Sequence, residues 1–186
     1  MTISADHIRK VIDRYLTIYP DEDSGLSPLL MALAERPDTL ASRRDTIGHV
    51  TCGVAASRSD GRVLSIRHRA LDRWLLPGGH LEESDFSLEG AAVRELTEEV
   101  GIPGRDLSGI GGLGGVPIDI DIHLIPANPA NHEPAHEHYD FRFAFVVSSS
   151  AISLQEEEVT SFEWVFPAEL HSESLRRKLS CLVEVA

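Results

Sequence analysis

One stretch constrains the fold of this chain more than any other: residues 76–102, LPGGHLEESDFSLEGAAVRELTEEVGI. Gly78 and Gly79 permit a sharp turn, an acidic loop follows, and Gly101 provides a C-terminal cap for the helix that we expect after the loop. Because residues three and four apart share a helix face, carboxylates gather on one face and an apolar stripe lies beside them. The carboxylates are those of Glu95, Glu98 and Glu99, and the stripe consists of Ala92, Val93, Leu96 and Val100.

Three carboxylates on one helix face repel one another unless a positive charge lies between them. Hard oxygen ligands at this density suit Mg²⁺ or Mn²⁺, and such ions usually bridge to substrate phosphates. The alternative is a solvated surface helix on which Arg94 pairs with Glu98 one turn later. The flanking glycines favour the metal site, because they hold the loop beside the carboxylates as one rigid unit.

These residues carry a family resemblance. Gly79 and the run RELTEEVGI at residues 94–102 resemble the Nudix box of the MutT-like Nudix hydrolase family. The family pattern is Gly, five residues, Glu, seven residues, and then Arg-Glu-apolar-x-Glu-Glu-x-Gly-apolar. This chain departs from the pattern in the loop, where Asp85 replaces the first Glu and eight residues precede Arg94. The extra residue is most simply Phe86, and the departure leaves the role of Asp85 open.

The resemblance implies a fold and an activity. The implied fold is an α/β sandwich, a mixed β-sheet with helices on both faces, and the order of the expected strands and helices agrees with it. The implied activity is metal-dependent cleavage of a nucleoside diphosphate linked to another moiety, such as a nucleotide sugar, ADP-ribose or a nucleoside triphosphate. Mg²⁺ or Mn²⁺ is the implied cofactor, because such an ion neutralises phosphate oxygens and lowers the pKa of the attacking water.

The resemblance also assigns roles to residues of this chain. Glu95, Glu98 and Glu99 are the expected metal ligands, and Arg94 is expected to orient them through charge-assisted hydrogen bonds. The general base is either Glu98 or Glu99, or one of the glutamates at 156–158 in a later loop.

The chain divides at about residue 45. We expect a helical N-terminal extension over residues 1–44 and the Nudix hydrolase domain over residues 45–186. The extension is a cap, a dimerisation element, part of the substrate pocket or a packing appendage. The expected elements, in chain order, are helices over 6–18 and from Ser27 to Pro37, a β-hairpin over 49–58 and 63–69, the helix that ends at Gly101, strands over 118–124, 136–147 and 159–166, a short helix after Pro167, and a terminal helix over 174–185.

The strand over residues 136–147 has two chemically different faces, because side chains alternate along a strand. The aromatic face is expected in the core, and the polar face binds a metal, binds a phosphate through Arg142, lines the pocket or is solvated. A zinc site there would need a further ligand from elsewhere. His49 and His68, on the two strands of the expected hairpin, could face substrate, but a lone strand histidine is more often structural. The aromatic face holds Tyr139, Phe141, Phe143 and Phe145, and the polar face holds His136, His138, Asp140 and Arg142. The predicted substrate-binding residues are Gly79, His80, His138 and Arg142.

Composition limits the partners and the compartment. The formal net charge of -13 and the lack of a basic stripe argue against long nucleic acids, whereas a small nucleotide is compatible because metals supply positive charge. No apolar run approaches the roughly 20 residues of a membrane span, so we expect no membrane partner and a cytoplasmic protein. Cys52 is expected to be a buried thiol. A homodimer is the default expectation for the oligomeric state.

Two other functions could use the same scaffold. One is different chemistry, such as prenyl-diphosphate isomerisation or mRNA decapping, and the net charge disfavours decapping. The other is a catalytically silent nucleotide-binding or regulatory module. The clustered carboxylates argue against silence, because a binding module has no need of mutually repelling charges.

Overall fold

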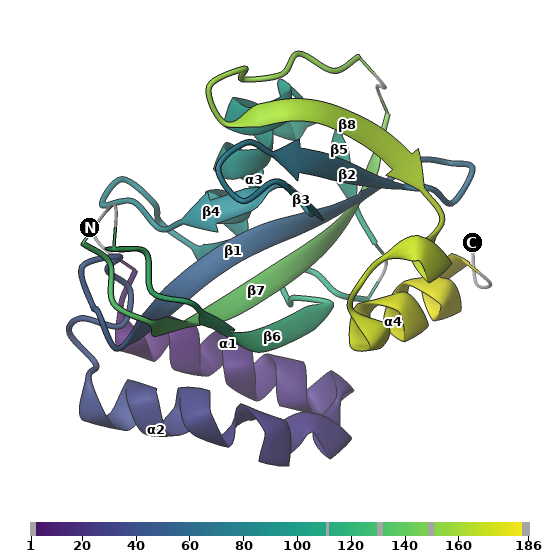
Figure 1. Cartoon of the computed structure of the whole chain (residues 1–186). Helices are drawn as coiled ribbons and strands as arrows, with labels where there is room; N and C mark the ends of the chain where they lie inside the picture. The colour runs from purple at the N-terminus through teal and green to yellow at the C-terminus, as the bar shows by residue number, and fades with distance from the viewer. Residues whose placement is uncertain (1–2, 111, 130–131, 149–150, 184–186) are drawn as a thin grey trace.

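The computed structural model describes residues 3–110, 112–129, 132–148 and 151–183. Within them, eight strands form one mixed sheet (Figure 1). The main strand order is β3-β2-β1-β7-β5, with β4 beside β1, β6 beside β7 and β8 beside β2. The strands are β1 (Gly48–Ser57), β2 (Val63–His68), β3 (Arg73–Leu75), β4 (Gly78–His80), β5 (Leu107–Gly109), β6 (Asp119–Ile125), β7 (His136–Val147) and β8 (Val159–Val165). The helices are α1 (Ala5–Ile18), α2 (Ser27–Glu35), α3 (Leu88–Val100) and α4 (Glu173–Val183), with 3-10 helices over Pro20–Leu26, Gly104–Asp106 and Pro167–Glu169.

β1 and β7 form the centre of the sheet. They pair in parallel along the whole of β1, and every residue of β1 is buried. β2 leaves β1 directly after the turn: Ser57 pairs with Val63, and β2 then pairs with β3 and β8. The expected β-hairpin is therefore correct at its turn and wrong along its strands, because β4 and β7 take the pairing positions on the two sides of β1.

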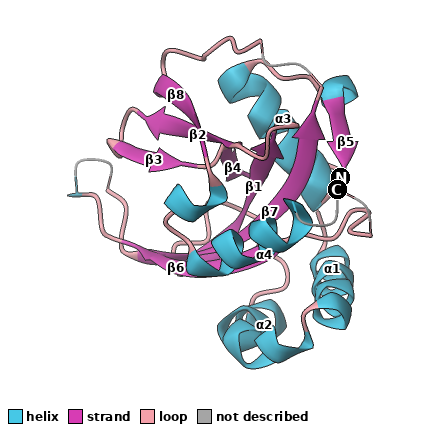
Figure 2. Cartoon of the chain, turned by 90° about the vertical axis from the view of Figure 1, so that its right-hand side faces the viewer, coloured by secondary structure: helices cyan, strands magenta, loops and turns pink. Residues whose placement is uncertain are grey.

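Different helices cover the two faces of the sheet. Val54 of β1 and Phe143 of β7 belong to the hydrophobic core that also contains Leu96 of α3. The neighbouring residue Ala55 packs in a second cluster with Leu175 of α4. Because side chains alternate across a strand, α3 and α4 lie on opposite faces (Figure 2). This arrangement confirms the expected α/β sandwich with a mixed sheet.

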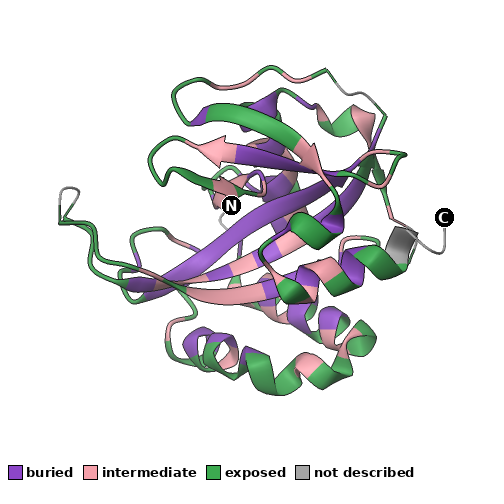
Figure 3. Cartoon of the chain, turned by 45° about the vertical axis from the view of Figure 1, so that its right-hand side comes forward, coloured by how far each residue is buried: buried purple, intermediate pink, exposed green. Residues whose placement is uncertain are grey.

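The two helices before β1 pack closely on the rest of the molecule. Ser4 caps α1 by accepting a hydrogen bond from the amide of His7, and the acidic segment after α1 forms a 3-10 helix over Pro20–Leu26. Ile12 and Leu29 are fully buried in the same core as α3. Figure 3 shows buried residues on one side of these helices and exposed residues on the other. The extension thus shares the hydrophobic core of the sheet, and the proposed domain boundary stays a prediction.

Apolar and polar residues alternate over residues 118–124, a pattern that predicts a half-buried strand, and β6 departs from that prediction at two positions. Ile118 and Ile120 are buried as expected, but Asp119 between them is buried as well, and Leu124 is exposed. Asp119 tolerates burial because two cations neutralise it, as described below. The prediction from alternation was therefore wrong at Asp119 and Leu124.

The C-terminal part follows its predicted order of strand, short helix and terminal helix, although the short helix is a single 3-10 turn. The last two residues of the expected terminal helix, 184–185, lie outside the described residues. Across the described ranges, no helix combines the length and apolarity that crossing a bilayer requires. Cys52 is buried, as expected for a structural thiol.

Candidate active site

The glycine turn and the carboxylate helix form one structural unit. α3 begins after Ser87, whose hydroxyl accepts a hydrogen bond from the amide of Gly90 at 3.0 Å. The helix ends at Gly101, which adopts the left-handed conformation with φ of 73°. Buried apolar residues hold the helix on the core and leave Glu95 and Glu99 facing the glycine turn. They are Ala92, Leu96 and Val100, with Val93 partly buried.

Close packing requires both glycines of the turn. A Cβ atom at Gly78 would lie 2.3 Å from the carbonyl oxygen of Cys52, and one at Gly79 would lie 2.7 Å from the carboxylate of Glu95. The amide of Gly78 donates a hydrogen bond of 2.8 Å to Oε2 of Glu99. The backbone of the turn therefore lies directly against two carboxylates of α3, an approach that side chains would prevent.

Arg94 connects the loop to the helix face. Its Nε and Nη2 donate to the two carboxylate oxygens of Asp85, each at 3.0 Å, and Nη2 also donates to the backbone carbonyl of His80 at 2.8 Å. Its Nη1 donates to Glu95 at 3.0 Å and to Glu98 at 2.9 Å. Bidentate charge-assisted pairs of this kind fix orientation as well as charge. The orienting role expected of Arg94 stays a prediction, which these contacts support.

The irregular part of the loop holds Asp85 in place. Asp85 is buried, and its Oδ2 accepts a further hydrogen bond from the amide of Glu82 at 2.7 Å. Phe86 lies between Asp85 and the helix cap Ser87 and is 82% exposed. The loop therefore accommodates its additional residue at the surface, and the shorter aspartate still reaches Arg94. The sequence left the role of Asp85 open, because residue spacing does not show whether an extra loop residue moves Asp85 away from Arg94.

Glu95, Glu98 and Glu99 of α3 differ in burial and in the cost of their ionised forms. Glu99 is 2% exposed, and burial together with neighbouring carboxylates raises its pKa to about 8. Burial also raises the pKa of Glu95, whereas 51% of the Glu98 side chain is exposed. Raised pKa values mean that the ionised forms are costly in this environment. A divalent cation would relieve that cost, and carboxylate oxygens are the ligands that Mg²⁺ and Mn²⁺ prefer.

A later loop reaches the same helix. The backbone amide of Gln155 donates to the carbonyl of Glu99 at 3.0 Å. Glu158 is exposed, and its charge contributes to the raised pKa values of Glu95 and Glu99. Among the three consecutive glutamates of this loop, Glu158 therefore has a direct electrostatic link to the carboxylates of α3.

Arg142 and His138 lie on the face of the sheet opposite α3, because they alternate with the aromatic residues of β7. Arg142 donates to Asp140 at 2.9 Å, to Asp119 at 3.1 Å and to Asp121 at 2.8 Å. Its guanidinium is thus already engaged by three carboxylates. The predicted binding of substrate by Arg142 stays a prediction, and it would require some of these ion pairs to open.

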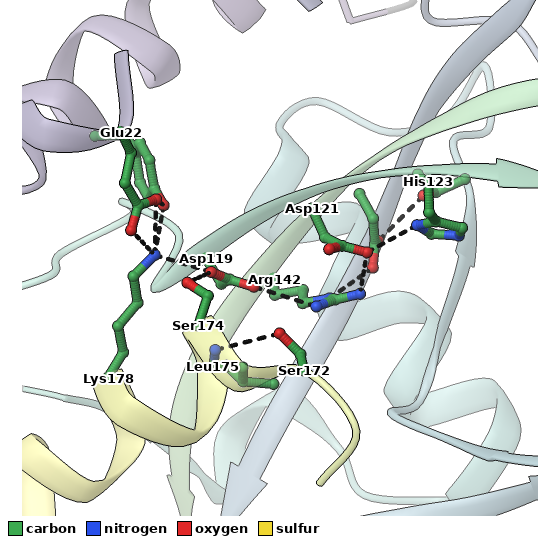
Figure 4. Close-up of polar contacts among 12 residues, drawn as sticks. Glu22, Asp119, Asp121, His123, Arg142, Ser172, Ser174, Leu175 and Lys178 are labelled. Carbon is green, nitrogen blue, oxygen red and sulfur yellow. Dashed lines mark hydrogen bonds and ion pairs between the residues drawn. The ribbon is translucent and has the colours of Figure 1, made fainter. Parts of the chain in front are cut away.

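A buried lysine extends this ionic network to the terminal helices. Nζ of Lys178 donates to Asp119 at 2.8 Å, to Glu22 at 2.9 Å and to the hydroxyl of Tyr15 at 2.6 Å. Figure 4 shows the chain of contacts from Glu22 through Lys178 and Asp119 to Arg142. Charges are buried only when they are paired in this way. The network explains the burial of Asp119, which the sequence pattern did not predict.

The two histidines predicted to bind substrate lie together, and a third joins them. The ring centroids of His80 and His138 are 5.5 Å apart, and those of His49 lie 5.0 Å from His80 and 4.8 Å from His138. His49 is opposite His138 in the β1–β7 pair, and its neighbour on the same face, Thr51, is opposite His80 in the β1–β4 pair. Sequence reasoning named His49 as a residue that could face substrate but did not place it beside His80 and His138. Strand parity was the available signal, but the pairing register of distant strands is not readable from one sequence.

Comparison with known proteins identifies the family. A family model described as the NUDIX domain matches residues 48–183, and the chain belongs to the Nudix hydrolase family. A curated relative from Lactococcus lactis subsp. cremoris, named "Probable DHNTP pyrophosphohydrolase", is 29% identical over 97 residues, which are 52% of this chain and 54% of that protein. The chain thus spans about half the length of this relative.

Solved structures share the fold. An Ap4A hydrolase from C. elegans superposes with a TM-score of 0.54 at 17% identity, covering 74% of this chain and 98% of that one. The E. coli dihydroneopterin triphosphate pyrophosphohydrolase gives a TM-score of 0.51 at 22% identity, covering 74% of this chain and 96% of that one. At these identities the likeness establishes the Nudix fold alone.

Proposed function

We propose that this chain is a metal-dependent pyrophosphohydrolase that cleaves a phosphoric anhydride in a small nucleotide-like substrate. One observation carries the proposal: Arg94 and the glycine turn hold the carboxylates of Glu95, Glu98 and Glu99 close together. Burying such carboxylates costs stability at neutral pH, as their raised pKa values indicate. A function that depends on a bound cation accounts for these destabilising carboxylates, because the cation would stabilise their ionised forms. Membership of the Nudix hydrolase family supports the same activity.

Mg²⁺ or Mn²⁺ is the proposed cofactor, and the residues of α3 fit such an ion. Glu95, Glu98 and Glu99 offer hard oxygen donors, and the absence of a side chain at Gly79 lets the backbone of the turn approach the carboxylate of Glu95. When bound, the ion would neutralise phosphate charge and lower the pKa of water. The chain's own contribution is to hold the oxygen donors in one orientation through Arg94.

Glu158 is our candidate for the general base, because Glu98 and Glu99 already accept hydrogen bonds from Arg94 and from the turn. A carboxylate that accepts the proton of the attacking water contributes about 10²–10⁴-fold to the rate. Glu158→Gln should therefore lower kcat by about 100-fold at saturating Mg²⁺. Glu163→Gln, which changes an exposed carboxylate of β8, is the matched control. Wild-type kcat in Glu158→Gln would assign the base to α3 instead.

For the substrate, we propose a small heterocycle-bearing triphosphate or a related dinucleoside compound. Support comes from the names of similar proteins, which include pyrophosphohydrolases of DHNTP and of dihydroneopterin triphosphate and an Ap4A hydrolase. The contacts predicted from the sequence, at Gly79, His80, His138 and Arg142, remain part of the proposal. His80 is tied to the site most directly, because its carbonyl accepts a hydrogen bond from Arg94.

A substrate panel tests the proposed function. The panel contains dihydroneopterin triphosphate, nucleoside triphosphates, Ap4A, ADP-ribose, nucleotide sugars and a prenyl diphosphate, each with and without Mg²⁺ or Mn²⁺. We expect metal-dependent release of phosphate, pyrophosphate or a nucleotide from at least one compound. Isomerisation of the prenyl compound, or tight binding of one compound without any turnover, would overturn the proposal in favour of the alternative activities.

A further inference from the structure

We infer that the chain carries a second metal site, formed by the imidazoles of His49, His80 and His138, which binds a divalent transition-metal ion such as Zn²⁺. The ligand atoms that these three side chains offer all lie within 4.8 Å of one another. Zn–N bonds of about 2.0–2.1 Å require the nitrogens of a tetrahedral site to be closer, so modest ring rotations would complete it. Nitrogen donors suit zinc, whereas the carboxylates of α3 suit Mg²⁺, so the two sites differ in chemistry.

The three ligands come from three strands of the sheet. His49 lies on β1, His80 ends β4 and His138 lies on β7, and the pairing registers bring them to one face. That face is opposite the face on which α3 packs, so the histidine cluster and the α3 carboxylates lie on different sides of the sheet. Ligands supplied by paired strands are held more rigidly than ligands on loops, and a metal site needs such rigidity.

His49 gives the most specific indication of a ligand. It is 3% exposed, and its Nδ1 lies 3.0 Å from the backbone carbonyl of Asp45. A carbonyl can only accept, so Nδ1 carries the proton and Nε2 offers a lone pair. Among the described residues, Nε2 of His49 is the buried side-chain nitrogen or oxygen atom without a hydrogen-bond partner. Buried polar atoms are nearly always satisfied, and an imidazole held through Nδ1 is typical of metal ligands.

The neighbouring histidines leave the other ligands in the required form. Nδ1 of His136 donates to the carbonyl of Pro134 at 2.9 Å, so its Nε2 accepts a hydrogen bond from Nε2 of His138 at 3.2 Å. That contact leaves Nδ1 of His138 without a proton. Burial lowers the pKa of His80 to about 4 and that of His138 to about 3, and burial also lowers the pKa of His49. Neutral imidazole is the form that binds metals.

An ion at this site would connect β4, which contains the glycine turn, to the central strands β1 and β7. The carbonyl of His80 accepts a hydrogen bond from Arg94, while its imidazole belongs to the histidine cluster. Three protein ligands leave a fourth coordination position for a water or a substrate group, as in zinc sites with three protein ligands. The inference goes beyond the proposed hydrolysis and does not depend on the identity of the substrate.

Zinc binding to the untagged full-length protein tests the inference directly. Zn²⁺ is titrated in competition with a chromophoric chelator, in excess Mg²⁺ so that the carboxylates of α3 are occupied. We expect one Zn²⁺ per chain, and affinity reduced at least about tenfold in His80→Gln and in His138→Gln. His171→Gln, which changes an exposed histidine outside the cluster, should keep wild-type affinity. Wild-type affinity in both cluster variants would overturn the inference.

Two further measurements exclude other sources of zinc binding. Cys181→Ser and Glu98→Gln should retain wild-type zinc affinity, and a loss in either variant would assign the ion to the exposed thiol or to α3 and overturn the inference. Co²⁺ bound to the wild-type protein should show the intense visible bands of a tetrahedral site, a readout that needs no substitution. A weak octahedral spectrum would contradict the three-histidine site even if the variants misfold.

Discussion

Two arginines in this molecule are each held by three carboxylates, but the two clusters differ in how their charges are balanced. Around Arg94, buried Glu99 adds a further carboxylate, and burial raises the pKa values of Glu95 and Glu99. Around Arg142, Lys178 adds a second cation. The partners of Arg94 are Asp85, Glu95 and Glu98, and those of Arg142 are Asp119, Asp121 and Asp140.

The difference separates a site that can bind a cation from one that already contains its cations. At Asp121, the hydrogen bond with His123 and the charge of Arg142 lower the pKa, so its ionised form is stabilised. At Glu99 the ionised form is destabilised until a positive charge arrives. We conclude that an arginine paired with three carboxylates does not by itself indicate a cation-binding site. The better indication is that carboxyl groups near the arginine, here Glu95 and Glu99, still have pKa values above the ordinary value.

Removal of Lys178 should have the largest effect, and it should act on stability. Lys178 is 6% exposed, and its loss would leave Asp119 and Glu22 without that cation. Breaking a buried ion pair typically costs about 3–5 kcal/mol, so Lys178→Met should lower the free energy of unfolding in urea by about that amount. Lys10→Met is the control, since its pair with Asp6 is exposed and contributes about 0.2–1 kcal/mol. Equal effects of the two changes would contradict a structural role for the Arg142 cluster.

The pH dependence of stability should reveal the raised pKa of Glu99. Without metal, burial raises the pKa of folded Glu99 to about 8, whereas the ordinary pKa of a glutamate, as in the unfolded chain, is 4.5. The folded state therefore binds more protons between these values, and stability falls as the pH rises from about 5 to about 8, by about 2 kcal/mol or more. Urea unfolding in EDTA should show this slope in the wild type and a smaller slope in Glu99→Gln. Identical slopes would mean that the Glu99 carboxyl group of the folded protein does not hold a proton between about pH 5 and pH 8.

The same substitution in the two clusters should have different consequences. Asp85→Asn weakens the bidentate pair that orients Arg94, so kcat should fall by about 10–100-fold. Asp140→Asn weakens one of three pairs of Arg142, so it should lower stability by about 1–2 kcal/mol, and because Arg142 is proposed to bind substrate, any effect on catalysis should be on KM and not on kcat. Steady-state kinetics and urea unfolding of both variants make the comparison. A similar fall of kcat in Asp140→Asn would give the Arg142 cluster a role in the chemical step and contradict the comparison.

The sequence predicted local features and missed features that depend on strand register. The carboxylate face of α3 and its cap at Gly101 follow from helix periodicity and from the preference of glycine for positive φ. The surface position of Phe86 is also local, although spacing alone did not show that Asp85 still reaches Arg94.

Contacts between segments that are distant in the chain could not be predicted from the sequence. His49 meets His138 only through the parallel pairing of β1 with β7, and a single sequence does not contain that register. Lys178 is buried because α4 packs against β6, where Asp119 accepts its hydrogen bond, and no periodicity within α4 predicts that contact. The prediction of a hairpin between β1 and β2 was wrong along β2 for the same reason. The two edges of β1 pair with β4 and β7, and one sequence does not show which strands pair.

Metal-dependent turnover in Glu98→Gln tests the central claim most directly. Glu98 is the most exposed of the three carboxylates, so the substitution should leave the melting temperature unchanged. The measurement is the rate of hydrolysis of the best substrate as a function of Mg²⁺ concentration, in the wild type and in this variant. We predict Mg²⁺-dependent turnover in the wild type and a rate at least about 100-fold lower in Glu98→Gln at every Mg²⁺ concentration. Full activity in Glu98→Gln would contradict the assignment of the α3 carboxylates as the catalytic centre.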